Sequence, residues 1–175
     1  MTLGLYIGRF QPFHNAHLGI ALESLRQCDK LLFVLGSAQQ SRTRKNPFTV
    51  EERSSMIRAS LEGAGVSPER ILFAGIEDHP DDAVWCQRVK AAAARYSPKP
   101  VLFGAEKDDS AYYLRIFPEW ELRIFPVQIS MSATEIRQRY FAGQVFEHMV
   151  QGGASSFLHQ FAQTADFAAL KAVQT

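Results

Sequence analysis

A strand, a glycine and the start of a helix open this chain, and their order restricts the fold more than any other feature. Apolar residues 3–7 are followed by Gly8, and helical periodicity begins at Leu18. Backbone N–H groups and the positive end of a helix dipole gather where such a helix begins, which suits a phosphate. His14 and His17 are three residues apart, so both imidazoles would lie on one face of the helix start. The pattern predicts a phosphate-binding loop.

The same residues have two other interpretations. A glycine that follows a strand is often only a turn with no ligand. Two histidines at this spacing also suit a metal ion, but a zinc site would need a third ligand nearby. The nearest cysteine, Cys28, lies at the far end of the predicted helix. Both interpretations stay open beside the phosphate hypothesis.

Composition sets the size and the class of the protein. With 175 residues, 46% of them hydrophobic, we expect residues 1–175 to form a single domain with its own core. The formal net charge of +1 leaves no broad basic surface, so we expect no nucleic-acid partner. Residues 31–35, the longest apolar run near the N-terminal half, are too few to span a membrane. Cys28 and Cys86 are widely spaced and no secretory segment is evident, which predicts reduced thiols and a cytoplasmic location.

Alternating strand and helix patterns predict an α/β fold. Residues 3–7 and 31–35, with a helical period between them, are typical of a right-handed crossover in a doubly wound parallel sheet. Further strands are predicted at residues 71–75, 101–104 and 122–126. Ligands bind such sheets at the carboxyl ends of the strands, where Gly8 and the polar loop 78–82 lie.

Two segments have the pattern of a capping box, in which paired side chains satisfy N–H groups at a helix start. Thr49 and Glu52 predict a helix from residue 50 to about residue 61. Ser132 and Glu135 predict a second helix start, where N–H groups would again suit an anion. A capped helix without a ligand is the alternative for the second segment.

Helices and a basic loop complete the predicted order. Helical segments are expected through Trp85 to residue 96 and at residues 110–117. From about residue 132, C-terminal helices are expected to pack on the sheet, with Gly152 and Gly153 as a break between them. In the loop at residues 36–47, three cations fall within four residues, namely Arg42, Arg44 and Lys45. Such a run is usually solvated, and contact with phosphate is the alternative.

One segment resembles the signature of the nucleotidylyltransferase superfamily: Gly8-Arg9-Phe10-Gln11-Pro12-Phe13-His14-Asn15-Ala16-His17. It is most similar to nicotinamide mononucleotide adenylyltransferases of the archaeal type and to the adenylyltransferase domain of Nudix-linked bifunctional relatives. The resemblance covers residues 4 to about 161 and implies a Rossmann-like fold, with no residues left for a Nudix domain. The family usually has glycine where this chain has Ala16.

The resemblance also implies roles for residues in each of its blocks. It implies that ATP is bound by Gly8, Arg9, Phe10, His14, His17, Gly104, Ser132, Thr134 and Arg137. It implies that the catalytic side chains are His14, His17, Lys45 and Arg137. Lys107 and Asp108 follow Gly104 in the block that packs near ATP in the Nudix-linked relatives.

Trp85 and Asp82 are implied to bind nicotinamide mononucleotide. By itself Trp85 fits an ordinary core position better than a ligand-binding one. In the family, the matching tryptophan stacks on the nicotinamide ring, and the residue that matches Asp82 is often asparagine. Oxidised nicotinamide is a pyridinium cation, which an indole face and a carboxylate both favour.

The implied reaction is adenylyl transfer from ATP to nicotinamide mononucleotide, which gives NAD and pyrophosphate. Mg²⁺ is the expected cofactor and arrives with ATP, without a metal site in the chain itself. The alternatives are adenylyl or cytidylyl transfer to another phosphate acceptor, and a non-catalytic module that senses ATP or NAD. The expected partners are these nucleotides, with neither nucleic acid nor membrane, and relatives of this type often form homo-oligomers.

Overall fold

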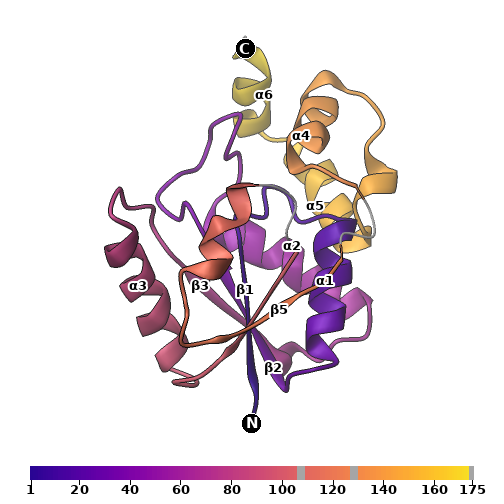
Figure 1. Ribbon diagram of the computed structural model, residues 1–175. Coiled ribbons are helices and arrows are strands. Elements are labelled where there is room, and N and C mark those ends of the chain that lie inside the picture. Colours follow the sequence, from indigo (N-terminus) through magenta and orange to yellow (C-terminus); the bar gives the residue numbers. More distant parts are fainter. Residues whose placement is uncertain (106–108, 127–129, 174–175) are drawn as a thin grey trace.

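A sheet of five parallel strands lies at the centre of the computed structural model, which describes residues 1–105, 109–126 and 130–173 (Figure 1). The strands are β1 (Leu3–Gly8), β2 (Lys30–Leu35), β3 (Ile71–Gly75), β4 (Val101–Gly104) and β5 (Glu121–Ile124). Their order across the sheet is β3-β2-β1-β4-β5. The chain therefore moves outward from β1 in one direction and returns to continue in the other, which confirms the predicted doubly wound fold.

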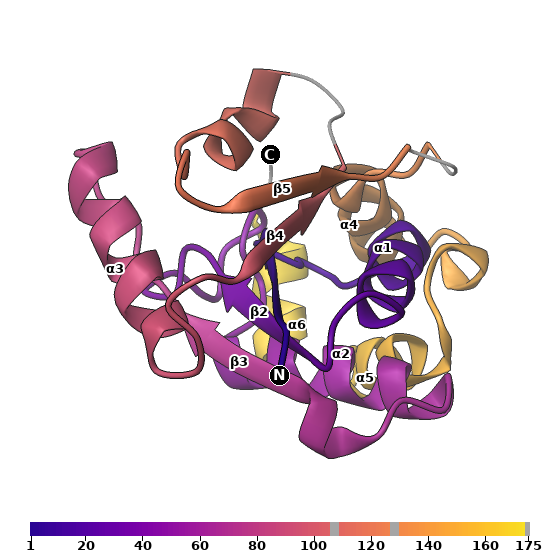
Figure 2. The same cartoon turned by 60° about the horizontal axis from the view of Figure 1, so that its bottom comes forward.

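Helices cover both faces of this sheet. They are α1 (Asn15–Leu25), α2 (Val50–Gly63), α3 (Asp82–Ala94), α4 (Ala133–Ala142), α5 (Gly152–Phe161) and α6 (Ala165–Ala172), with 3-10 turns η1 (Pro68–Arg70), η2 (Asp109–Arg115) and η3 (Glu147–Met149). Figure 2 shows α3 on one side of the sheet and α1 and α2 on the other. Within β1, Leu5 and Ile7 pack with α3 and η2, whereas Tyr6 packs with α1 and α2. Two covered faces explain why the central strands are continuously apolar.

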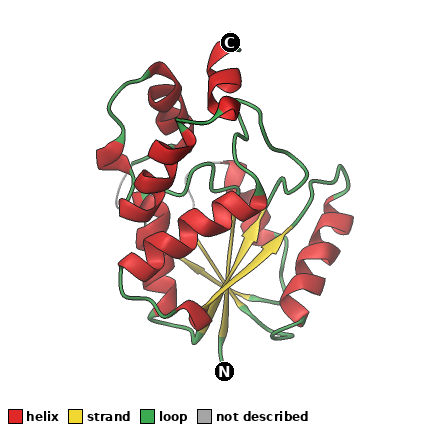
Figure 3. Cartoon of the chain, turned by 180° about the vertical axis from the view of Figure 1, so that it is seen from behind, coloured by secondary structure: helices red, strands yellow, loops and turns green. Residues whose placement is uncertain are grey.

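The C-terminal helices pack against α2. Their apolar residues form a cluster with Phe48 and Met56, and the described members of this cluster include no strand residue. Figure 3 shows the strand arrows pointing toward the end of the molecule that carries these helices. The prediction that they pack on the sheet was wrong, because α1, α2, α3 and η2 already cover its faces.

Gly152 and Gly153 begin helix α5, so the predicted break is also corrected. A Cβ atom at Gly153 would lie 2.5 Å from the carbonyl carbon of Ala59, so the glycine lets α5 approach the backbone of α2. The chain instead leaves α4 at Gly143, which has a φ of +70°. That left-handed conformation is a common helix end and costs glycine little.

The two predicted capping boxes have different outcomes. At the start of α2 the N–H of Thr49 donates to Glu52 Oε2 (2.9 Å) and the N–H of Glu52 donates to Thr49 Oγ1 (3.2 Å), as predicted. At the start of α4 the Ser132 hydroxyl accepts from the N–H of Thr134, so Ser132 does cap the helix. The Glu135 carboxylate instead pairs with an arginine one turn later, and no box forms there. The predicted helix at residues 110–117 is the shorter turn η2.

Two smaller points concern the whole chain. In the part that the structure describes, no helix is both long and apolar enough to cross a membrane. Cys28 and Cys86 are free and buried, in agreement with the prediction of reduced thiols. Burial raises the pKa of the Cys28 thiol to about 11, so this thiol stays protonated near neutral pH.

Candidate active site

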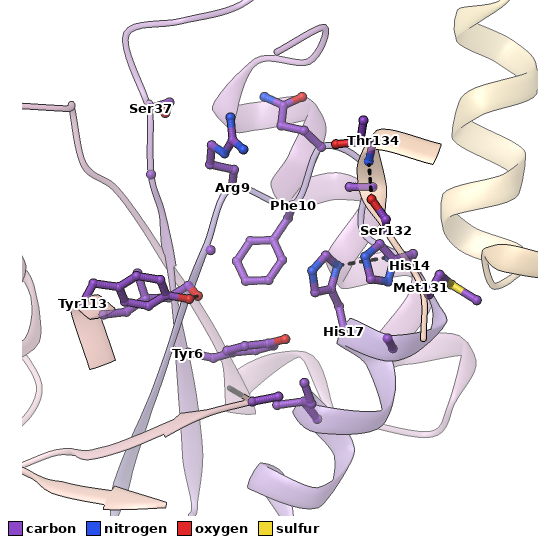
Figure 4. A pocket seen from close by; sticks show the side chains of 18 of the residues that line it. Tyr6, Arg9, Phe10, His14, His17, Ser37, Tyr113, Met131, Ser132 and Thr134 are labelled. Carbon is purple, nitrogen blue, oxygen red and sulfur yellow. Dashed lines mark hydrogen bonds between the residues drawn. The ribbon is translucent and has the colours of Figure 1, made fainter. Parts of the chain in front are cut away.

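A cavity of about 940 Å³ opens at the carboxyl edge of the sheet (Figure 4). It is lined by the end of β1, by the segments that follow β2, β3 and β4, and by the first turn of α4. It therefore lies at the crevice between β1 and β4, where doubly wound sheets bind their ligands. Small-molecule sites usually measure about 300–1,000 Å³, so this cavity is at the upper end of that range.

Aromatic packing fixes the loop between β1 and α1. Phe10 has a φ of +52°, which is unusual for a bulky residue, and its buried ring lies 5.2 Å from that of Tyr6 and 5.9 Å from that of Phe13. A Cβ atom at Gly8 would lie 2.8 Å from the Phe10 ring, so only glycine leaves this ring its place. Gly8, Arg9 and Phe10, which the family resemblance predicts as ATP-binding residues, all line the cavity.

His14 and His17 meet at the start of α1. His14 precedes the helix and is 2% exposed, and its ring stacks on that of His17 with 3.6 Å between the centroids. The N–H of His14 donates to Nδ1 of His17 (3.3 Å). Both side chains line the cavity, as does Ala16 between them. The structure therefore brings the two predicted histidines together at the start of α1.

Arg137 lies on α4 and also lines the cavity. Its side chain is 9% exposed, Nη1 donates to the carbonyl of Gln11 (2.8 Å), and Nη2 donates to Thr134 Oγ1 (3.2 Å). Burial, together with the positive charge of Arg9, lowers the pKa of Arg137 to about 10, so the guanidinium stays charged at neutral pH. Ser132 and Thr134 line the same wall.

Gln11 joins three segments around this wall. Its buried side chain donates to the carbonyl of Phe48 (2.9 Å) and accepts from the N–H of Phe48 (3.0 Å). Its own carbonyl is the one that Arg137 binds. In the sequence, Gln11 is only one residue of the segment that resembles the family signature and has no predicted role. Nothing in the sequence shows which distant backbone groups its side chain binds.

Arg53 is a further buried arginine that sequence reasoning did not select. It lies on α2, is fully buried, and Nη1 donates to the carbonyls of Arg9 and Gly36, each at 2.8 Å. Burial is the main cause that lowers its pKa, to about 10. Its position on the inner face of α2, one turn before Met56 and Ile57, was the available signal, since a charge among core positions must have a specific partner.

Trp85 and Asp82, predicted as residues that bind the acceptor nucleotide, also line the cavity. Trp85 is half-buried, with its ring near those of Tyr113 (6.5 Å) and Phe117 (6.0 Å). The hydroxyl of Tyr112 donates to Asp82 Oδ1 (3.3 Å), and burial followed by the Asp82 charge raises the pKa of Tyr112. Both tyrosines line the cavity and were not predicted, so this end combines aromatic faces with a carboxylate.

Asp78 is a second carboxylate at the cavity, just beyond β3. It accepts hydrogen bonds from Ser37 Oγ (3.1 Å), Gln39 Nε2 (3.2 Å) and Gln40 Nε2 (3.2 Å). Asp78 and Ser37 both line the cavity. The sequence placed Asp78 only within a polar loop, since its neutral partners come from a loop about forty residues earlier.

Some predicted residues lie elsewhere. Lys45 is exposed and is not among the residues that line the cavity. Its neighbours are held by the C-terminal region: Arg42 pairs with Asp166 (2.6 Å), and Arg44 lies over the ring of Phe141 (4.4 Å). Gly104 is buried at the end of β4 behind Ala105, which lines the cavity. The predicted positions 107 and 108, Lys107 and Asp108, lie outside the described residues.

The chain's own side chains do not form a metal site within the described ranges. No three residues of the types His, Cys, Asp and Glu come together there in a group that could hold an ion. The stacked His14 and His17 thus have no third ligand of these types among the described residues. The donors at the cavity are N–H groups and cationic side chains, which fit the phosphates of a nucleotide better than a bare cation.

Comparisons with known proteins agree with this geometry. A family model described as cytidylyltransferase-like matches residues 5–139. The chain is 40% identical over 161 residues to the nicotinamide/nicotinic acid mononucleotide adenylyltransferase of Acinetobacter baylyi, covering 90% of this chain and 85% of that protein. It is 32% identical over 161 residues to a nicotinamide-nucleotide adenylyltransferase of Thermococcus kodakarensis, covering 90% of this chain and 82% of that one.

Solved structures give the same result. A bifunctional NMN adenylyltransferase/ADP ribose pyrophosphatase from Francisella tularensis, complexed with AMP and a manganese ion, is 28% identical and has a TM-score of 0.86. A second structure of a bifunctional enzyme of this description from the same organism has a TM-score of 0.91 at 28% identity. The alignments cover 98% of this chain and 52% of the solved chains, so this chain spans about half their length.

Proposed function

The chain belongs to the cytidylyltransferase-like family, and on that basis we propose that it transfers the adenylyl group of ATP to nicotinamide mononucleotide. The products are NAD and pyrophosphate. The observation that carries the proposal is one cavity with two sets of lining residues: the aromatic wall of Trp85, Asp82 and Tyr112, and the phosphate wall of His14, His17 and Arg137. One wall suits a cationic aromatic ring, and the other suits phosphates.

ATP binds at the phosphate wall in this proposal. The starts of α1 and α4 both lie there, and each presents N–H groups that have no partner within its own helix. His14, His17 and Arg137 add donors, and Arg9 adds an exposed cation at the rim. Ser132 and Thr134 would hold the chain of phosphates near α4, and Lys45 would reach it only from outside the cavity.

Nicotinamide mononucleotide binds at the aromatic wall. The pyridinium ring would stack on Trp85, because a cation is attracted to the face of an indole. The Asp82 carboxylate, held by Tyr112, lowers the energy of the positive ring further. This wall favours a nicotinamide nucleotide over acceptors with neutral rings, such as flavin mononucleotide.

The chemical step is an in-line displacement at the α-phosphorus of ATP. An oxygen of the acceptor 5′-phosphate forms the new P–O bond, and the bond to pyrophosphate breaks, with both electrons leaving on pyrophosphate. A phosphate monoester has a second pKa of about 6, so the nucleophile is already ionised and no general base is required. Catalysis then depends on positioning and on neutralisation of charge. In this scheme His17 donates to the α-phosphate and Arg137 to the leaving phosphates.

A divalent cation fits this site as part of the nucleotide. Phosphate oxygens are ligands that Mg²⁺ prefers, and the cavity is also lined by the carboxylates of Asp78, Asp82 and Glu135. When bound with ATP, Mg²⁺ would neutralise charge on the leaving pyrophosphate. We also propose a cytoplasmic location, which the buried free thiols of Cys28 and Cys86 support.

The position of the label in ATP tests this reaction. With ³²P at the α-phosphate, the purified chain should convert nicotinamide mononucleotide to a labelled dinucleotide, and with ³²P at the γ-phosphate the label should leave as pyrophosphate. Formation of ADP or of inorganic phosphate as the first product would overturn the proposal. Labelled dinucleotide with only a different acceptor would keep adenylyl transfer and reject the substrate.

A further inference from the structure

One nitrogen of Arg53 holds two turns of the backbone at once. Nη1 donates to the carbonyl of Arg9, after β1, and to the carbonyl of Gly36, after β2, each at 2.8 Å. Nε donates to the carbonyl of Thr49 at the start of α2 (3.2 Å), which fixes the guanidinium relative to its own helix. Arg53 thus joins the carboxyl ends of the two central strands to α2.

The carbonyls of Arg9 and Gly36 each directly precede a residue in an unfavourable conformation. Phe10 has a φ of +52° and Ser37 has a φ of +50°, in the left-handed region that residues with side chains rarely adopt. Such conformations persist only where the surroundings hold them, and they are frequent at functional sites. The two bonds from Arg53 supply such a restraint at both places.

The direction of the N–H groups follows from the planarity of the peptide. In a trans peptide the C=O and the next N–H point in opposite directions, so the N–H groups of Phe10 and Ser37 point away from Arg53. Both residues line the cavity, and Arg53 does not. Within the described ranges, neither N–H donates to a protein acceptor. Two N–H groups from different strands are therefore available to an anion at this edge.

We propose that Arg53 is a positioning residue for adenylyl transfer. It holds the turns at Phe10 and Ser37 so that their N–H groups face the phosphates of the bound nucleotides. This inference rests on the proposed function, and Arg53 itself touches neither nucleotide. Among described residues no carboxylate forms an ion pair with Arg53, and its buried Nη2 has no hydrogen-bond partner. Glu51 and Asp78 lie near enough to raise the pKa of Arg53, so its charge is partly offset, and its role here is to hold the two carbonyls.

Arg70 provides a matched control. It also binds three backbone carbonyls: Nε donates to Asp29 (2.9 Å), and Nη2 donates to Leu25 (2.6 Å) and Cys28 (2.9 Å). These residues lie at the end of α1 and in the turn before β2, at the edge of the sheet opposite to the cavity. Arg70→Met removes as many carbonyl contacts as Arg53→Met, without touching a residue that lines the cavity.

The test compares the two methionine variants by kcat, by KM for each nucleotide and by thermal midpoint. We expect both midpoints to fall, while only Arg53→Met loses about a hundredfold in kcat. Arg53→Lys keeps the charge and enough donors for both carbonyls, so its kcat should be at least tenfold higher than that of Arg53→Met. The proposal is overturned if Arg53→Met keeps kcat within threefold of the parent, or if Arg70→Met loses as much.

Two further measurements keep the test independent of folding and of the reaction. In the ¹⁵N-labelled parent, the amide signals of Phe10 and Ser37 should move saturably downfield with inorganic pyrophosphate; unmoved signals at saturation would reject the assigned direction of these N–H groups. If the parent itself produces no pyrophosphate, the proposed function fails. The role of Arg53 is then read from ATP affinity by calorimetry: Arg53→Met should bind tenfold more weakly, and unchanged affinity would overturn it.

Discussion

His14 and His17 stack at 3.6 Å between ring centroids, and Nδ1 of His17 accepts the N–H of His14. Because Nδ1 is the acceptor, the proton of a neutral His17 ring lies on Nε2. The ring is also packed against Phe13 on one side and edge-on to Phe10. His17 is thus held in one tautomer and one orientation before a substrate arrives.

The substitution His17→Ala tests this arrangement. If Nε2 of His17 donates to the charge that develops at the α-phosphate, its loss should cost about 3 kcal/mol, or about a hundredfold in kcat. Steady-state turnover with saturating nucleotides measures the effect. His159→Ala, which removes an exposed ring paired with Glu147, is the control and should be unchanged. Turnover within threefold of the parent would remove His17 from this role.

Asp82→Asn tests the preference between acceptors. A carboxylate beside the ring should disfavour nicotinic acid mononucleotide, whose ring carries a second carboxylate, and favour the amide. The preference is measured as kcat/KM with the amidated acceptor divided by kcat/KM with the acidic acceptor. We expect this ratio to fall by about tenfold in the variant. Asp81→Asn is the control, because Asp81 caps α3 and does not line the cavity. A ratio that is the same in the parent and in Asp82→Asn would exclude Asp82 as the selecting residue.

Gly153→Ala tests the packing of α5 on α2. The added methyl group would lie 2.5 Å from the carbonyl carbon of Ala59 and 2.6 Å from the N of Ser60, both backbone atoms. We expect the free energy of unfolding to fall by about 2 kcal/mol or more, measured by urea denaturation. Gly152→Ala meets no atom within 4 Å and should be neutral or slightly stabilising. Equal effects of the two substitutions would contradict the observed contact.

Glu52→Gln tests the contact between the basic loop and α2 as a function of pH. Glu52 accepts two bonds from Arg42 (2.6 and 2.7 Å). Burial alone would raise its pKa, but the bonds from Arg42 and Thr49 outweigh burial and hold it below 4.5. A carboxylate whose pKa is lower in the folded than in the unfolded state stabilises the fold at pH values above its unfolded pKa. This stabilisation is lost as the pH falls through the folded pKa.

We therefore expect Glu52→Gln to cost about 1 kcal/mol at pH 7 and progressively less below pH 4.5. Thermal midpoints at several pH values provide the measurement. Glu62→Gln, which loses only a long contact of 3.9 Å with Arg58, is the matched control. A difference between Glu52→Gln and the parent that persisted unchanged into acid would show that the charge of Glu52 is not the cause.

Local patterns predicted most of the fold. Each of the five strands is where an apolar run indicated it, and the Thr49 and Glu52 box starts its helix as expected. The errors concern contacts between distant elements. No local pattern shows that α5 packs on α2, because both the sheet and α2 offer apolar surfaces of the same kind. Ser132 and Glu135 have the spacing of a capping box, but the Glu135 carboxylate forms an ion pair with Arg139 in place of the bond to the backbone of Ser132.

The residues of the candidate site also fall into two groups, those that the sequence predicted and those that it did not. His14, His17, Asp82, Trp85 and Arg137 were identified because they match a family pattern, and all line the cavity. Residues that bind backbone groups of distant segments were not identified by the family pattern. Gln11 and Arg53 bind carbonyl or N–H groups far away in sequence, and a backbone partner has no residue identity to recognise. Lys45 was selected only because its position matches a cation in the family pattern, and its contact with phosphate stays a prediction.

The most direct test of the central claim is pyrophosphate release by the purified chain with ATP and Mg²⁺. Parallel reactions would contain nicotinamide mononucleotide, nicotinic acid mononucleotide, flavin mononucleotide or no acceptor. We predict release only with the nicotinamide-type acceptors, faster with the amide than with the acid, and matched mole for mole by dinucleotide. Release with none of these acceptors, from a protein that still binds ATP, would contradict adenylyl transfer and favour a module that senses nucleotides.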